Sequence, residues 1–205
     1  MSLLKSLAVY YVTDKEITYG HNYIPGYEDL FQSRRNKVRN MLEIGIGLGS
    51  HFDYISSLYP NYTMGGGLKM WRDYFPGAQI YGIDILECPI KEPRITTLVA
   101  NQTKSQDLFR VVHLMGGVID IVVDDGSHVA NDQVFSFMVL AEFITKDGIY
   151  VIEDVQHEYI ESFKTLTIFP TEFQTYIKDN FNVKWYDTRQ DTKFTDDFLM
   201  VFIRK

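Results

Sequence analysis

The chain of 205 residues is 45% hydrophobic, and its 27 Asp and Glu residues outnumber its 20 Lys and Arg residues, which gives a formal net charge of -7. This length suits one domain with a substantial core, so we expect a single domain over residues 1–205. The acidic balance argues against a surface that neutralises phosphate backbones, and we expect no nucleic-acid partner. A single cysteine, Cys88, excludes an internal disulfide and a thiolate zinc cluster.

The N-terminal residues 3–9 are apolar, but this run is short and leads into polar residues without the cleavage pattern of a signal peptide. No apolar run approaches the roughly 20 residues that a transmembrane helix needs. We therefore expect a cytoplasmic protein with no membrane partner.

Five runs rich in β-branched and apolar residues alternate with segments of helical spacing; they cover residues 41–46, 78–83, 95–100, 118–123 and 148–152. This alternation is typical of an α/β fold, in which crossover helices join parallel strands. The runs are continuously apolar, so we expect helices on both faces of the sheet. Helical spacing over residues 132–143 predicts the crossover between the fourth and fifth strands. Two later runs, at residues 181–186 and 198–203, predict a terminal hairpin.

The segment 50–75 interrupts this rhythm. It contains several tyrosines and the triple glycine 65–67, and it is too long for a simple connection. We predict an inserted loop with glycine hinges that leads into a short helix and forms a lid or a binding wall. Its aromatic side chains could stack on a sugar face or on an aromatic ring, and ordinary packing is the alternative; they are Tyr54, Tyr59, Tyr62 and Trp71.

Three glycines, Gly45, Gly47 and Gly49, follow the first predicted strand. Without Cβ atoms, such a loop can turn tightly and bring backbone N–H groups against a ligand. A dinucleotide fingerprint would need a further glycine at position 50 and an acid about 20 residues on, and the chain has neither. Instead, Glu43 precedes the glycines and suits a cationic ligand group, while Asp84 ends the next strand and can accept both ribose hydroxyls. These residues favour an adenosine-containing ligand over a turn that serves only packing.

Acids also end the fourth and fifth predicted strands. Asp124 and Asp125 precede His128, and Glu153 and Asp154 follow the next strand. Neighbouring parallel strands deliver their carboxyl ends to one crevice, where such acids would repel each other, so we expect a cation among them. A hard divalent ion such as Mg²⁺ is the natural occupant. A lysine or arginine in that space would instead leave only the nucleoside pocket.

A helix that began soon after residue 126 would place Asp125 and His128, three residues apart, on one face. The imidazole would then lie beside the metal, where a coordinated hydroxyl loses its proton more easily. The alternative is that Asp124, Asp125 and Ser127 are turn and capping residues with His128 at a helix start.

Together these motifs resemble the class I methyltransferases that modify the sugars of macrolides such as mycinamicin and macrocin. The resemblance covers residues 13–159 and rests on five segments: the glycine motif at 43–49, residues 65–76, residues 82–84, residues 124–128 and residues 151–154. It implies a Rossmann-like, seven-stranded, mostly parallel sheet with a C-terminal antiparallel hairpin and helices on both faces. Residues 14–27 are similar to the family's N-terminal segment that covers the cofactor.

The resemblance also implies site residues. Those implied for S-adenosylmethionine are Glu43, Gly45, Gly47, Gly49, Asp84, Asn101, Gln102 and Asp124. Those implied for Mg²⁺ are Asp125, Glu153 and Asp154, with His128 as the general base and Asp125 beside it in the catalytic group.

The expected function is O-methylation of a sugar hydroxyl, in a glycoside or a nucleotide sugar. Mg²⁺ would chelate two neighbouring substrate oxygens, His128 would take the proton, and the oxygen would attack the sulfonium methyl. A catechol-like small diol is the alternative acceptor, and a non-catalytic subunit that binds S-adenosylmethionine is the alternative role. The number of subunits stays open, with a homo-oligomer as one alternative.

Overall fold

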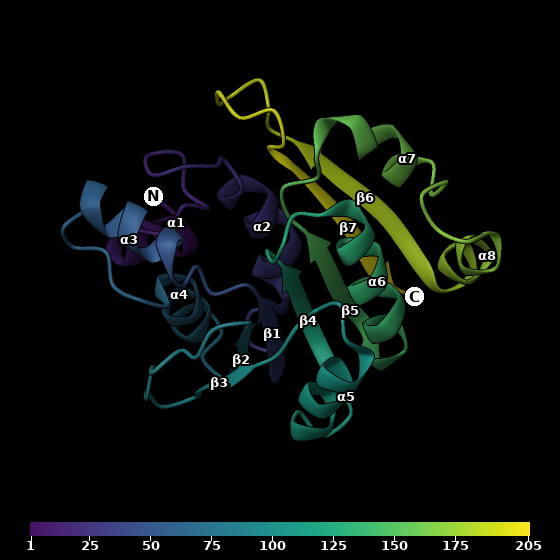
Figure 1. The fold of residues 1–205 in the computed structure, drawn as a ribbon, viewed down its shortest axis with the longest axis horizontal. Coiled ribbons are helices and arrows are strands. Elements are labelled where there is room, and N and C mark those ends of the chain that lie inside the picture. The colour runs from purple at the N-terminus through teal and green to yellow at the C-terminus, as the bar shows by residue number, and fades with distance from the viewer.

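A computed structural model describes the whole chain, residues 1–205, apart from the side chains of Ser50 and His51. One sheet has the strand order β3-β2-β1-β4-β5-β7-β6 (Figure 1). Its strands are β1 (Asn40–Ile44), β2 (Gln79–Asp84), β3 (Ile95–Val99), β4 (Ile119–Asp124), β5 (Ile144–Ile152), β6 (Phe181–Asp187) and β7 (Phe198–Arg204). Strands β1 to β5 pair in parallel, and β7 is antiparallel to both β5 and β6. The predicted α/β fold and its terminal hairpin are confirmed.

Helices cover both faces of this sheet, as its apolar strands predict. The helices are α1 (Leu3–Tyr11), α2 (Ile24–Phe31), α3 (Ser50–Leu58), α4 (Gly66–Tyr74), α5 (Ser105–Leu114), α6 (Ala130–Leu140), α7 (Ile160–Lys164) and α8 (Thr171–Asn180). Side chains of α5, α6, α7 and α8 pack with Leu42 of β1 on one face, and those of α1, α2 and α4 pack with its neighbour Met41 on the other. Successive residues of one strand thus contribute to two cores. Across the described residues, no helix has the length and apolarity to cross a membrane.

The segment 50–75 differs from the predicted loop. It forms α3 and then α4, and α4 is part of the core, since Leu68, Met70 and Trp71 are fully buried. Trp71 is therefore not free to stack on a substrate, and the packing alternative holds for it. Tyr54 on α3 is 63% exposed and is the aromatic residue of this segment that faces solvent most.

Strand register explains why distant motifs meet. Asp124, the last residue of β4, pairs with Ile44 on one side and with Ile152 on the other. Gly45, Asp125 and Glu153 each follow one of these three strand ends, so they lie next to one another along the carboxyl edge of the sheet. Backbone hydrogen bonds continue past the strand ends, because the amide of Asp125 donates to the carbonyl of Ile44 at 2.9 Å.

Candidate active site at the carboxyl edge of the sheet

The loop after β1 has the backbone that its glycines permit. The φ angles of Gly45, Gly47 and Gly49 are 86°, 68° and 63°, a region that side chains with a Cβ rarely adopt. A Cβ on Gly45 would lie 1.9 Å from the carbonyl oxygen of Asp125. The close approach at Gly45 is to the backbone that follows β4, and the approach of this loop to a ligand stays a prediction.

Asp84 ties this loop to the end of β2. One carboxylate oxygen accepts a hydrogen bond from the amide of Ile46 at 3.1 Å, and the other accepts from the amide of Leu86 at 3.0 Å. Each oxygen keeps a second lone pair, so the carboxylate can still accept ligand hydroxyls.

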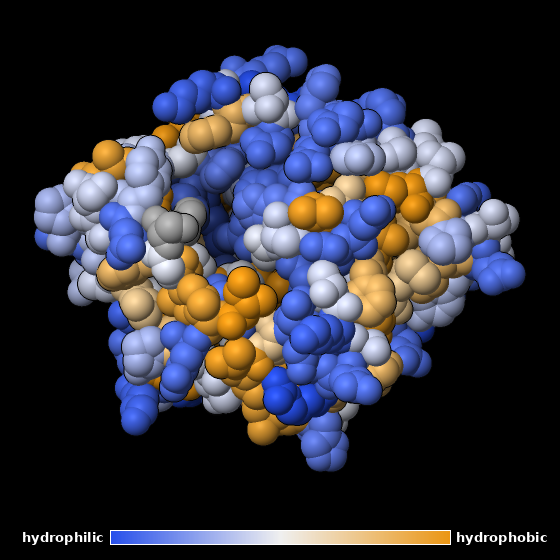
Figure 2. Space-filling view, in the orientation of Figure 1, coloured by the Kyte–Doolittle hydropathy of each residue, from blue (hydrophilic) through white to orange (hydrophobic). Residues whose placement is uncertain are grey.

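Two cavities meet at Asp84. The larger, about 260 Å³, is lined by Glu43, Gly47 and acids of the β4 and β5 ends, and the smaller, about 200 Å³, is lined by Ile85, Asn101 and neighbours. They share Gly45, Asp84 and Gly126 as common lining residues. Figure 2 shows a hollow with mainly hydrophilic walls in the molecular surface. The joined cavities suit an elongated ligand that carries hydroxyls at its middle.

Gln102 lines the smaller cavity, and Asp124 behind it holds its side chain in place. Gln102 donates to Asp124 at 3.1 Å and accepts from the amide of Ser127 at 2.7 Å, which uses both ends of its amide. Asp124 is fully buried and also accepts from Ser136 and Tyr150, at 2.5 and 2.8 Å. Burial raises its pKa to about 6. Asp124 lines neither cavity, so its effect on a ligand passes through Gln102.

Asn101 lies at the rim of the smaller cavity. Its side-chain oxygen accepts from the amide of Thr103 at 2.9 Å, which folds the residue back on its own turn. Its side-chain nitrogen, Nδ2, is the group that can donate a hydrogen bond to a ligand.

Lys15 occupies the space among the acids. Its Nζ lies 2.6 Å from Asp125, 2.8 Å from Glu153 and 3.5 Å from Glu43, and its side chain is 2% exposed. Burial alone would lower the pKa of Lys15, but the charges of Asp125, Glu153 and Glu43 outweigh burial and raise it well above the ordinary value. The sequence predicted a cation here and assigned a metal ion; the structure places an ammonium group between two of the three proposed metal ligands, Asp125 and Glu153. The sequence also predicted that a lysine in this space would leave only the nucleoside pocket, so a metal ion could bind both of these acids only if Lys15 moved away.

Two buried tyrosines complete the acid cluster. The hydroxyl of Tyr27 donates to Glu153, and that of Tyr23 donates to Asp154. Burial raises the pKa of Glu153 well above its ordinary value, and it raises that of Asp154 to about 6. Both shifts favour the protonated, uncharged carboxyl, because burial disfavours the ionised form.

His128 lies beside the cluster, but not in the predicted way. Helix α6 begins only at Ala130, so Asp125 and His128 do not share a helix face. A turn with a φ of 56° at His128 instead places Nε2 3.1 Å from Asp125 and Nδ1 3.4 Å from Asp154. Burial would lower the pKa of His128, but its hydrogen bond to Asp125 and the charges of the acids outweigh burial and raise the pKa to about 10. In this arrangement His128 is a cation.

Ser127 fits the alternative reading of a turn residue. Its hydroxyl donates to Asp132 at 2.7 Å and accepts from the amide of Val129 at 3.3 Å, at the start of α6. This local role is independent of any ligand.

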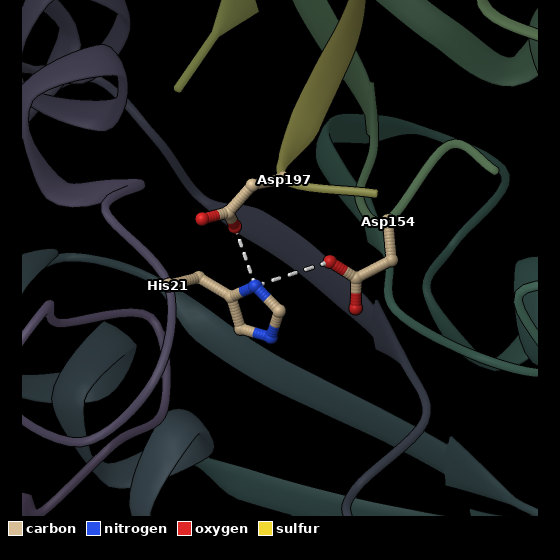
Figure 3. Close-up of side chains that lie close together, drawn as sticks. All are labelled: His21, Asp154 and Asp197. Atoms are coloured by element: carbon tan, nitrogen blue, oxygen red, sulfur yellow. Dashed lines mark hydrogen bonds and ion pairs between the residues drawn. The ribbon is translucent and has the colours of Figure 1, made fainter. Parts of the chain in front are cut away.

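A second histidine contacts the cluster from the N-terminal side. His21 Nδ1 lies 2.5 Å from Asp197 and 3.6 Å from Asp154 (Figure 3). Burial would lower the pKa of His21, but the hydrogen bond with Asp197 and the nearby acids raise it to about 9. Asp197, just before β7, was missed at the sequence level, because no local motif marks a residue that only the hairpin brings to this edge.

Two groups of side chains have polar atoms that all lie within 4.8 Å of one another, and both include Asp154; one is Asp125, His128 and Asp154, and the other is His21, Asp154 and Asp197. Glu153 belongs to neither group, because Lys15 and Tyr27 hold it. The structure thus brings together two of the three acids proposed for a metal.

This fold and site define a class. A parallel sheet with an antiparallel β7 between β5 and β6, a glycine loop after β1 and an acid at the end of β2 are the features of the class I methyltransferase fold. The predicted fold class is therefore confirmed.

Comparisons with known proteins narrow the class. The chain is 35% identical, over 78% of its length and 38% of the relative's, to mycinamicin VI 2''-O-methyltransferase of Micromonospora griseorubida. It is 40% identical, over 68% of its length and 33% of the relative's, to a Streptomyces olivaceus enzyme, 8-demethyl-8-(2-methoxy-alpha-L-rhamnosyl)-tetracenomycin-C 3'-O-methyltransferase. No family model matches the chain.

A solved structure agrees with these relatives. The mycinamycin-pathway methyltransferase MycE, in complex with Mg, SAH and mycinamycin VI, matches 99% of this chain and 53% of its own, with a TM-score of 0.76 and 26% identity. The resemblance to macrolide sugar O-methyltransferases is thereby confirmed. The chain spans between 33% and 38% of the length of these curated relatives.

Proposed function

We propose that the chain is an S-adenosylmethionine-dependent, Mg²⁺-dependent O-methyltransferase that acts on a sugar hydroxyl of a glycoside or a nucleotide sugar. The observation that carries this proposal is the pair of cavities joined at Asp84, with Asp125, His128 and Asp154 in the wall of the larger one. The similarity to sugar O-methyltransferases supports the acceptor class.

The residues present fit S-adenosylmethionine. Asp84, between the cavities, has the free lone pairs to accept ribose hydroxyls, and the cavity lined by Ile85 and Asn101 would take the adenine. The methionine part would lie in the larger cavity, over the glycine loop and next to Glu43, whose carboxylate suits a cationic group. When bound, this cofactor supplies a methyl group activated by a positive sulfonium.

The acids fit a divalent cation in part. Asp125 and Asp154 already converge, and Glu153 would complete the three-carboxylate set once Lys15 releases it. Bound Mg²⁺ would offset the acids' charge and acidify a substrate hydroxyl.

His128 must be neutral to accept the hydroxyl proton. Its pKa of about 10 comes from the charges around it, chiefly that of Asp125. When those charges are neutralised, the pKa of His128 falls toward the ordinary value of about 6.5, where an imidazole serves as a base near neutral pH. Asp125 would orient the ring in this step.

Assays with defined acceptors test the proposal. The chain is incubated with S-adenosylmethionine and either glycosides, nucleotide sugars or catechols, with Mg²⁺ or with EDTA, and S-adenosylhomocysteine is measured by mass spectrometry. We expect product with a sugar acceptor, and we expect EDTA to abolish it. Product from catechols alone would show that the acceptor is a catechol-like diol and not a sugar. Cofactor binding with no product from any acceptor would favour a non-catalytic subunit.

Substitution of His128 tests the proposed base. We expect His128→Gln to lower kcat by about 10² to 10⁴ without changing the Kd for S-adenosylmethionine. His113→Gln, on the exposed side of α5, is the matched control and should leave both unchanged. An unchanged kcat in His128→Gln would contradict the assignment of the base.

A further inference from the structure

Lys15 belongs to a segment that reaches the acid cluster from one side. We call residues 13–23 the strap. It folds back on itself, because the amide of His21 donates to the carbonyl of Asp14 at 2.6 Å and that of Tyr23 donates to the carbonyl of Lys15 at 3.1 Å. This closure points Lys15, His21 and Tyr23 toward the acids at the ends of β4 and β5, and His21 also toward Asp197.

The ammonium group fills the space that a metal ion on two of these acids would need. Oxygens of both Asp125 and Glu153 lie within 2.8 Å of Lys15 Nζ. An Mg²⁺ ion needs oxygens at about 2.0–2.1 Å, so an ion bound to both carboxylates would lie where Nζ lies now. Two cations at that separation, in a pocket where Lys15 is 2% exposed, would repel strongly.

The structure offers Lys15 another partner. Glu43 Oε1 lies 3.5 Å from Nζ, and both residues line the larger cavity. A rotation of the lysine side chain into this cavity would keep the ammonium paired while it frees Asp125 and Glu153. The strap backbone does not have to unfold for this exchange.

We infer that Lys15 and a divalent cation are alternative partners of Asp125 and Glu153, and that cation binding moves Lys15 Nζ from these two carboxylates to Glu43. This inference rests on the proposed metal site. It makes Lys15 a positioning residue that sets the affinity of the site for the metal. The ammonium would pair with Oε1 of Glu43, its nearer oxygen, and the other oxygen would serve the cationic group of the cofactor.

Calorimetric titration with MgCl₂ and with MnCl₂ tests this exchange. Lys15→Met removes the competing charge but keeps a long apolar side chain. We expect this variant to bind the cation at least about tenfold more tightly than the unmodified chain, because the cation no longer has to displace the ammonium group. Lys15→Arg keeps the charge and should bind as weakly as the unmodified chain. Lys178→Met, at an exposed side chain of α8 away from the strap, should also leave the affinity unchanged.

Equal or weaker cation binding by Lys15→Met would overturn the inference and leave the proposed function standing. Absence of cation binding in every variant would overturn both. Acylation of lysines in the unmodified chain, read by mass spectrometry, is independent of whether the variants fold. We expect Mg²⁺ to increase labelling of Lys15 relative to Lys5, and unchanged labelling in a metal-saturated chain would also overturn the inference.

Discussion

Trp71 and Glu43 show how a residue of the site depends on the core behind it. The indole Nε1 of Trp71 donates to Glu43 at 3.0 Å, and both side chains are buried. Burial raises the pKa of Glu43 to about 7, despite the opposing charge of Lys15. Trp71 is thus the neutral donor that keeps this carboxylate satisfied beside the cavity.

We expect Trp71→Phe to lower the free energy of unfolding by about 2–4 kcal/mol, because it removes buried ring volume and leaves the Glu43 oxygen without its donor. Urea denaturation measures this change. Trp185→Phe, at a side chain that is 45% exposed, should cost less than about 1 kcal/mol. Equal losses in the two variants would contradict the expected cost of removing the buried ring volume and the donor to Glu43.

Glu16 fixes the strap to α1 and is sensitive to pH. It accepts from the amide of Thr18 at 2.7 Å and lies 3.2 Å from Lys5 Nζ. Burial opposes ionisation, but Thr18 and Lys5 outweigh it, so the pKa of Glu16 is below its ordinary value. The ionised form therefore stabilises the fold above the unfolded-state pKa, and this contribution is lost as pH falls through the folded-state value.

We expect Glu16→Gln to be about 1 kcal/mol less stable than the unmodified chain at pH 7, and the difference to shrink below about pH 4. Thermal unfolding of both proteins between pH 7 and pH 3 measures it. A difference that stays constant over this range would rule out the ionised form as its source.

Among individual residues, sequence motifs marked Glu43, Asp84 and the acids after β4 and β5, because each lies at or near the end of a strand. They did not mark Asp197, and they placed Lys15 only in the cofactor-covering segment 14–27, not among the acids. Lys15 is separated by 110 residues from Asp125 and by 138 from Glu153, and no local pattern relates residues so far apart. Only the excess of acids indicated that some cation was needed.

Among the elements, the loop after β1 places the strictest demand on sequence. Gly45 combines a φ of 86° with a Cβ position 1.9 Å from the Asp125 carbonyl oxygen. Gly117 has a similar φ of 80°, but a Cβ there would have no atom within 4 Å. A comparison of substitutions at the two glycines thus separates the cost of the backbone conformation from the cost of a steric clash.

We expect Gly117→Ala to cost about 1 kcal/mol of stability, from the φ angle alone. Gly45→Ala should cost about 3 kcal/mol or more, because it also displaces the Asp125 carbonyl, and it should weaken binding of S-adenosylmethionine at least about tenfold. Denaturation and calorimetry measure the two effects. Similar losses in both variants would mean that the loop can shift away from Asp125 at little cost.

Strands were easier to predict than the helices of the segment 50–75. Their apolar runs are continuous, since both faces are covered, and their observed limits lie within a few residues of the predicted ones. Glycines 65–67 suggested hinges, yet Gly66 and Gly67 begin α4, and Gly67 lets the helix approach Glu43. A glycine needed for close approach has the same sequence signature as one needed for flexibility.

The whole molecule has two cores that share the same strands. Met41 and Leu42 of β1 face opposite cores, as do Val122 and Val123 of β4. Loss of either core would expose one face of the sheet, so the cores are expected to unfold together. The shared strands support the expectation of a single domain over residues 1–205.

We expect one cooperative transition. In Trp185→Phe, fluorescence reports Trp71 and hence the core that contains α4, whereas far-UV circular dichroism reports all helices and strands. The two urea midpoints should coincide. Separate midpoints would show that the two faces unfold independently.

Fold class followed from the alternation of strands and helices, together with the terminal hairpin. The position of the site followed from the general rule that ligands bind at the carboxyl ends of the strands in a parallel sheet. The resemblance implied that residues 14–27 cover the cofactor, but it did not reveal which acids the strap contacts, because these acids lie far along the chain, as Asp197 does from His21.

A lysine that already balances buried acids affects the order in which the chain folds and binds metal. Small zinc domains remain unfolded until their ion arrives. Here the polypeptide supplies a counter-ion of its own, because Lys15 is paired with Asp125 and Glu153. We therefore expect folding to need no metal, and we expect a chelator to remove the proposed Mg²⁺ without denaturing the chain.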